Sequence, residues 1–240
     1  IISAILALIL AAIPLTLAGA PILASYAQMF SGVFGSKFAF SEMLTRATPL
    51  IFTGLAAALA FRAKLWNIGA EGQLYLGAMA AAAIGTGVFD VSGVILIPTI
   101  ILFGCAAGAF GMIVPATLKI RFGADEVVTT LLLNFIIIIF LQYMLEGPLK
   151  DPMGLGWPQS SPILDQGMLP KVMDRMRIHY GLIIALLCAA FAQFMLVRSV
   201  WGFKLRAVGE NMNAARHAGI PVNRSLLTVA ALSGALAGLA

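Results

Sequence analysis

The sequence predicts an all-α fold, a bundle of helices that crosses a membrane several times. Hydrophobic residues make up 61% of its 240 residues and charged residues only 10%, whereas soluble domains are about 45–50% apolar and about 25% charged. The apolar residues gather in runs close to the roughly 20 residues that a spanning helix needs. The two-residue alternation of a membrane barrel is absent from the sequence, and an open strand cannot satisfy its backbone in lipid.

Seven apolar segments follow one another, and each predicts a helix. They are Ile1–Leu17, Leu44–Phe61, Gly72–Val88, Val94–Leu118, Val127–Leu145, Tyr180–Val197 and Leu226–Ala240. The chain begins inside one apolar run without an initiator methionine and ends inside another. We therefore expect one transmembrane domain over residues 1–240 that is truncated at both ends. Two GxxxG pairs, Gly104 with Gly108 and Gly234 with Gly238, predict close helix packing.

Basic residues predict the orientation of the chain. Nine follow the second, fourth and sixth segments, and five lie in the loops on the opposite side. The nine are Arg62, Lys64, Lys119, Arg121, Arg198, Lys204, Arg206, Arg216 and Arg224. Because cytoplasmic loops carry the excess of Lys and Arg, this side and the N-terminus are expected to be cytoplasmic. Topology also accounts for the net charge of +5, so no nucleic-acid partner is expected.

No residues predict a catalytic or metal site. Cys105 and Cys188 lie inside apolar segments without metal-ligand spacing. His179 and His217 are the only histidines, and neither belongs to an HExxH motif. The sequence also lacks a GxxxxGK[ST] phosphate loop, so the chain is not expected to hydrolyse ATP by that route.

A polar break between two apolar segments organises the chain. Asn67-Ile68-Gly69 interrupts the helix pattern, and Glu71 and Gln73 open the next segment. Polar side chains inside a membrane are costly unless they are used or satisfied. Two interpretations stay open. Glu71 is a first-turn carboxylate at the membrane surface, stabilised by the helix dipole, or Asn67, Glu71 and Gln73 belong to a discontinuous helix on a translocation path.

A second polar row is predicted along the segment Val127–Leu145. Glu126, Thr130 and Asn134 are spaced four residues apart, so they share one face of a helix. Asn134, deep in the span, either makes an interhelical hydrogen bond worth on the order of 1 kcal/mol or belongs to a pore lining. We favour the pore lining slightly, and take Thr130 and Asn134 as further candidates for the path or its gate.

The external loop, residues 146–177, is rich in proline and glycine, which predicts turns. Two interpretations stay open for this loop. It docks an external partner or caps the pore, or it is an inert covering of the bundle.

The cytoplasmic loop, residues 198–224, predicts one short helix. Asn211 is placed to cap a helix over Met212–Ala218, which Gly219 and Pro221 would end. This helix either docks into a groove on a partner or lies in the lipid headgroups.

Three stretches resemble the permease subunits of bacterial ABC importers in the branched-chain amino acid/ribose permease group. They are FRAKLWNIGAEGQLYLGAMAAA, RFGADEVVTTLLLNFI and WGFKLRAVGENMNAARHAGI. The similarity runs in order from about Thr45 to Ala240, and NIGAEGQ is typical of the nucleoside and simple-sugar branch. The loop Glu210–Gly219 is similar to the Glu-Ala-Ala…Gly coupling loop that contacts the ATPase, although Asn211–Asn213 separate Glu210 from the alanine pair. The coupling residues that this implies are Glu210, Met212, Ala214, Ala215, Arg216 and Gly219.

The resemblance implies a pore-forming subunit of an ATP-driven importer for nucleosides or simple sugars, in a bacterial cytoplasmic (inner) membrane. It implies that the chain is not itself an enzyme and holds no cofactor, because ATP would bind to a partner. The implied partners are two cytoplasmic ATP-binding subunits, a second permease subunit (identical or homologous), an external solute-binding lipoprotein and the lipid bilayer.

The residues also admit other functions. An ion- or proton-coupled secondary transporter would use Glu71 or Glu126 as its ion site, but it would need no docking loop. An intramembrane enzyme is disfavoured, because the sequence has no paired intramembrane acids.

Overall fold

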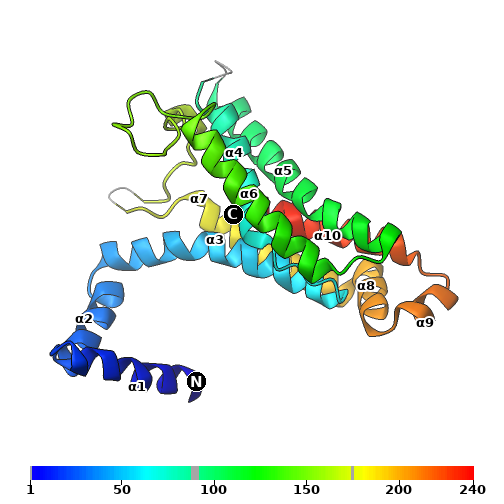
Figure 1. Ribbon diagram of the computed structural model, residues 1–240, viewed down its shortest axis with the longest axis horizontal. Coiled ribbons are helices and arrows are strands. Elements are labelled where there is room, and N and C mark those ends of the chain that lie inside the picture. The colour runs from blue at the N-terminus through cyan, green and yellow to red at the C-terminus, as the bar shows by residue number, and fades with distance from the viewer. Residues whose placement is uncertain (1, 88–91, 174–175) are drawn as a thin grey trace. The chain divides into compact units, whose positions relative to one another are not determined.

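The computed structural model describes residues 2–87, 92–173 and 176–240, and within them every element longer than an isolated bridge is helical (Figure 1). The all-α prediction is therefore confirmed. Val88, the predicted end of the third segment, and Arg175 of the external loop lie outside the described residues. The chain forms two compact units, Ile1–Arg46 with Lys171–His179, and Ala47–Pro170 with Tyr180–Ala240.

The first unit contains α1 (Ile2–Leu17), α2 (Ile22–Phe34) and the first turns of α3 (Lys37–Arg62). The Tyr26 hydroxyl donates a hydrogen bond to the Leu8 carbonyl and so joins α1 to α2. The Glu42 carboxylate pairs with Arg46 at 3.0 Å and with Arg177 at 3.2 Å, which ties Lys171–His179 to α3. The sequence does not predict α2, because serine and glutamine side chains dilute its apolar run.

The second unit is centred on three closely packed helices, α4 (Ala70–Gly85), α5 (Gly93–Phe122) and α10 (Val222–Gly238) (Figure 1). α6 (Glu126–Glu146) packs against α4 and α5. Glycines allow the close approach, because a Cβ atom on Gly108 would overlap the Gly234 carbonyl. A Cβ atom on Gly77 would likewise overlap the Gly238 carbonyl. The close packing predicted from the GxxxG pairs is confirmed.

The loop of residues 198–224, in the second unit, holds two helices where the sequence predicts one. α7 (Tyr180–Arg198) is followed by α8 (Val200–Glu210) and α9 (Met212–His217). The predicted cap is confirmed, because the Asn211 side chain accepts hydrogen bonds from Asn213 N and Ala214 N at 3.0 Å each. The predicted stop is confirmed too, since Gly219 takes a φ of +77°. The sequence does not predict α8, whose buried residues alternate with charged ones.

Four helices of the described chain are long and apolar enough to cross a bilayer: α3, α5, α6 and α7. α4 has only 16 residues, or about 24 Å at 1.5 Å per residue, against a hydrocarbon core of about 30 Å. α4 alone is therefore shorter than a full span. α3 begins at Lys37, ahead of the predicted start at Leu44. The added turns contain Glu42, which forms an ion pair with Arg46 one helical turn later.

Candidate functional site

α3 ends in a turn that sends the chain back into the bundle. Leu65 N donates to the Ala60 carbonyl at 3.1 Å, and Lys64 N donates to the Phe61 carbonyl at 3.0 Å, which is the Schellman pattern. Lys64 has a φ of +51°, a conformation usually taken by glycine. Beyond it the backbone is irregular up to Gly69, and its side chains alternate between buried and exposed. The helix thus breaks where the sequence predicts.

Asn67 and Gln73 form a buried pair of amides across this break. Asn67 Nδ2 donates to Gln73 Oε1 at 2.8 Å, and Gln73 Nε2 donates back to Asn67 Oδ1 at 2.9 Å. Asn67 Nδ2 also donates to Ser233 Oγ at 2.9 Å, and the Ser233 hydroxyl donates to the Ala56 carbonyl at 2.8 Å. The two amide side chains belong to residues only 3% and 2% exposed. This network joins α3, the break, α4 and α10, and a satisfied buried network of this kind rigidifies the structure around it.

Asn134 supplies the hydrogen bond that the start of α4 lacks. Gly69 occupies the N-cap position and offers no side chain, so the first N–H groups of α4 have no partner within the helix. Gly72 N donates to Asn134 Oδ1 at 2.5 Å. A side chain at Gly72 would prevent this approach, because its Cβ would lie 2.7 Å from that oxygen. Asn134 therefore makes the interhelical hydrogen bond that was one of its two predicted roles.

Thr130 lies one turn before Asn134 on α6 and also faces the break, but it approaches the break with its backbone. A Cβ atom on Gly69 would come within 2.8 Å of the Thr130 carbonyl, so backbone meets backbone there. Glu126, Thr130 and Asn134 are all buried, which confirms that they share one face of the helix. That face is turned towards the break and the first turn of α4.

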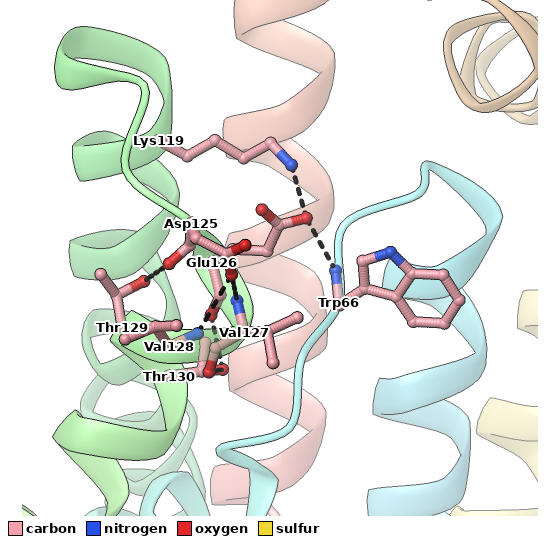
Figure 2. Close-up of polar contacts among 8 residues, drawn as sticks. All are labelled: Trp66, Lys119, Asp125, Glu126, Val127, Val128, Thr129 and Thr130. Atoms are coloured by element: carbon pink, nitrogen blue, oxygen red, sulfur yellow. Dashed lines mark hydrogen bonds and ion pairs between the residues drawn. The ribbon is translucent and has the colours of Figure 1, made fainter.

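The Glu126 carboxylate lies at the N-terminal end of this helix face. It forms an ion pair with Lys119 of α5 and lies 3.5 Å from the backbone N–H of Trp66 (Figure 2). The side chain of Glu126 is 8% exposed and that of Lys119 is 23% exposed, so the charges are partly desolvated but paired. Figure 2 shows the Trp66 indole pointing away from the carboxylate. The Glu126 carboxylate therefore links α5, through Lys119, and the break, through Trp66, to the first turn of α6.

Glu71 differs from the other four path candidates because it is exposed. Its nearest polar partner is the Tyr75 hydroxyl, which donates to Glu71 Oε1 over a long 3.4 Å. Its neighbour Gly72 contacts Asn134, which lies eight residues along α6 from Glu126. At 1.5 Å per residue, the contact between Gly72 and Asn134 is about 12 Å from the N-terminal end of α6. Glu71 is thus an exposed acid in the first turn of α4, beside the middle turns of α6 rather than at its end.

The six predicted coupling residues divide into two that are packed into the core and four that are exposed. Ala215 is 3% exposed and Met212 is half-buried, and both pack into the chain's own core with Leu205. The other four, Glu210, Ala214, Arg216 and Gly219, are exposed. Met212 and Ala215 thus face the core of this chain, and the four exposed residues face away from it.

α8 connects this inner helix to the break. A Cβ atom on Gly209 would overlap the carbonyl of Arg62, the last residue of α3. Leu205 and Val208 share one buried cluster with Ala63 and Leu65 of the turn. Sequence reasoning missed both Gly209 and Ser233, since each contacts a part of the chain far away in the sequence.

A broken helix inside a bundle of apolar spans, with a capped inner helix packed behind the break, defines a helical membrane transport protein. The chain belongs to the family described as the permease component of the branched-chain amino acid transport system, which matches residues 39–240.

Named relatives agree with this family. The chain is 37% identical to the guanosine ABC transporter permease protein NupP of Bacillus subtilis, over 100% of this chain and 69% of that protein. It is 36% identical to the glucose ABC transporter permease protein TsgB13 of Haloferax volcanii, over 90% of this chain and 59% of that protein. It is 29% identical to the nucleoside ABC transporter permease protein NupB of Lactococcus lactis, over 89% of this chain and 61% of that protein. No solved structure matches the chain.

The family resemblance is therefore confirmed, together with the prediction of a multi-pass membrane permease subunit. Such a permease is not itself an enzyme, and ATP hydrolysis belongs to a separate subunit. Membership in the family implies, in general terms, ATP-binding partners and a solute-binding protein.

Proposed function

We propose that this chain is one permease subunit of a bacterial ABC importer that carries nucleosides or simple sugars into the cell. The relatives named for guanosine, nucleosides and glucose support this solute class. The proposed assembly contains two cytoplasmic ATP-binding subunits, which hold the ATP, a second permease subunit and an external solute-binding lipoprotein. The permease itself holds no cofactor. The excess of basic residues on one side supports a cytoplasmic N-terminus.

The arrangement of α8 and α9 is the observation that carries this proposal. α9 is capped at both ends, buries Ala215 and leaves Ala214 and Arg216 exposed. α8 touches the last residue of α3 through Gly209. A push on the exposed face of α9 would therefore reach the break directly through packed atoms. A secondary transporter driven by an ion gradient has no use for such a docking face.

Glu71 is the residue that we propose to line the solute path. An acid at the depth of the third turn of α6, exposed to lipid on its own, would be strongly unfavourable. A solute path or the second permease subunit would give it a polar environment. We propose that Asn67, Gln73, Thr130 and Asn134 act behind it, holding the broken helix so that Glu71 keeps its position at the gate.

The solute is tested by uptake into proteoliposomes that contain the complete transporter. We expect ATP-dependent uptake of radiolabelled guanosine or glucose, and none of leucine. Uptake that follows a proton gradient and ignores ATP would contradict the importer and favour the secondary transporter.

Glu71→Gln tests the proposed path. Removing the charge while keeping the shape is expected to lower uptake at least several-fold, because the group facing the solute changes. Glu146→Gln is the control, since Glu146 is another exposed acid, at the C-terminal end of α6. Wild-type uptake by Glu71→Gln would return Glu71 to a purely structural role.

A further inference from the structure

The loop that follows α6 carries an apolar tip that the transport role does not use. Met153, Leu155 and Trp157 are 85%, 97% and 74% exposed. From Pro152 to Pro158 the chain reads PMGLGWP and contains no charged residue. Three large apolar side chains in a row on a loop, almost fully open, are unusual unless another phase or molecule covers them.

A small hairpin holds this tip in a defined shape. Lys150 and Ser160 form a bridge at its base. Asp151 N donates to the Gln159 carbonyl at 2.9 Å, and Gln159 Nε2 donates to the Asp151 carboxylate at 3.2 Å. Leu155 has a φ of +47°, a conformation in which a glycine would be less strained. Leu155 is therefore held outward in a left-handed backbone conformation, which is strained for a leucine.

Most backbone N–H groups of the hairpin, other than those of Leu155 and Gly156 at its tip, donate within it. Between Asp151 and Gln159, five amide N–H groups donate inside the hairpin. They belong to Asp151, Met153, Gly154, Trp157 and Gln159. Pro152 and Pro158 have no N–H to satisfy. This internal pairing lowers the cost of bringing the backbone near the hydrocarbon, where no hydrogen-bond partners are available.

The position of the hairpin on the chain favours a lipid surface. α6 has 21 residues, about 31 Å at 1.5 Å per residue, which matches the hydrocarbon core. Its outer end exposes the stacked rings of Phe140 and Tyr143, as aromatic residues do where a span meets the headgroups. The hairpin base begins four residues after the helix ends at Glu146. Each arm of the hairpin has about three residues and spans about 10 Å at roughly 3.3 Å per residue. A hairpin lying parallel to the membrane surface therefore keeps its tip in the headgroup layer.

We propose that the tip formed by Met153, Leu155 and Trp157 inserts into the outer boundary of the bilayer and anchors this loop to the lipid surface. A protein partner that visits the loop only during transport would leave these side chains in water for the rest of the cycle. The bilayer is always present beside α6, and Trp and Leu are favoured at its boundary. Insertion would hold the rest of the external loop in place over the outer ends of α4 and α5, where Leu164 N donates to the Gly85 carbonyl at 2.9 Å.

The test is a spin label at Met153→Cys in the assembled transporter, reconstituted in bilayers, with Cys105, Cys188 and any other cysteine replaced. Collisions of the label with oxygen, which concentrates in lipid, are compared with collisions with a water-soluble nickel chelate. A label at Ile139→Cys, on the exposed apolar side of α6, is the lipid reference. A label at Asp165→Cys, exposed in the same loop, is the water reference.

We expect the ratio of oxygen to nickel collisions at Met153 to lie severalfold above that at Asp165 and towards that at Ile139. In the variant with Leu155→Asp and Trp157→Asp, the same label should return to the Asp165 value, while assembly of the transporter is unchanged. A water-like ratio in the unmodified hairpin would overturn the proposal. So would a label that is water-like alone and becomes shielded from both reagents only when the solute-binding protein is added, because the partner would then be a protein.

Discussion

At the scale of single residues, the break depends on amide groups that pair with each other. Asn67 and Gln73 exchange two hydrogen bonds in a site closed to water. A buried polar group that loses its partner costs about 1–3 kcal/mol, whereas replacing both partners with apolar groups of similar shape can be nearly neutral. The pair therefore stabilises the break through mutual satisfaction rather than through either residue alone.

The first prediction follows from this pairing. Asn67→Leu and Gln73→Leu should each destabilise the protein by about 2 kcal/mol, because each strands the opposite amide. The double variant should be clearly less destabilised than the sum of the two, by 1 kcal/mol or more. Thermal unfolding in detergent measures all three variants. Strict additivity would show that the two side chains do not depend on each other.

The second prediction concerns the contact between α4 and α6. Gly72→Ala places a Cβ 2.7 Å from Asn134 Oδ1 and 3.1 Å from Ile137 Cδ1. The helices must separate, so we expect a loss of about 1–3 kcal/mol. Gly54→Ala is the control, because a Cβ there meets nothing within 4 Å and alanine favours the helix. Equal melting temperatures for the two variants would contradict the close approach of Gly72 to α6.

Residue patterns predict part of this site and miss its connections. The spacing of Glu126, Thr130 and Asn134 predicts one helix face, because a helix repeats every 3.6 residues. The reciprocal bonds between Asn67 and Gln73 could not be predicted, since they require an irregular backbone that turns both amides to the same place. Ser233 enters from a helix far along the chain, and no local pattern signals a contact of that range.

At the scale of elements, long apolar runs predict helices well and mixed segments poorly. The seven predicted segments all appear as helices, since each is long and almost free of charge. α2 and α8 were not predicted, because their polar residues weaken the apolar signal. In α8 the charges point outward while Leu205 and Val208 are buried, which is the pattern of a helix lying on a core rather than crossing a membrane.

The third prediction tests the link between α5, α6 and the break. Lys119→Met removes the cation that pairs with Glu126. Breaking a buried ion pair typically costs 3–5 kcal/mol. We expect about 2–3 kcal/mol here, because Lys119 is still partly exposed. Glu126→Gln in the same chain should recover part of the loss, since it removes the stranded charge. The midpoint of thermal unfolding measures both, and no recovery in the double variant would argue against a paired charge.

At the scale of the whole molecule, the proposed docking face and the proposed gate lie at the two ends of one packed path. The path runs from α9 through α8 to the end of α3, and from the break to α4 and α6. Its parts come from segments far apart in the sequence. A resemblance over three stretches predicts the family and the role of the inner loop, but only folding reveals that Gly209 touches the end of α3.

The fourth prediction addresses the docking face. Arg216 is exposed on α9, one position from the buried Ala215. Arg216→Glu should leave the fold intact, because the side chain makes no contact with the core, and it should disturb docking of the ATP-binding subunit through its reversed charge. Lys204→Glu is the matched control, since Lys204 is an exposed cation on α8 outside the proposed docking residues.

The most direct test of the account is ATP-dependent solute uptake by proteoliposomes that contain the complete transporter with either charge reversal. The account predicts that Arg216→Glu lowers uptake at least tenfold and releases the ATP-binding subunits, while Lys204→Glu keeps uptake within about twofold of the unmodified protein. Unchanged uptake and unchanged subunit binding in Arg216→Glu would contradict the claim that ATP hydrolysis drives this permease through α9.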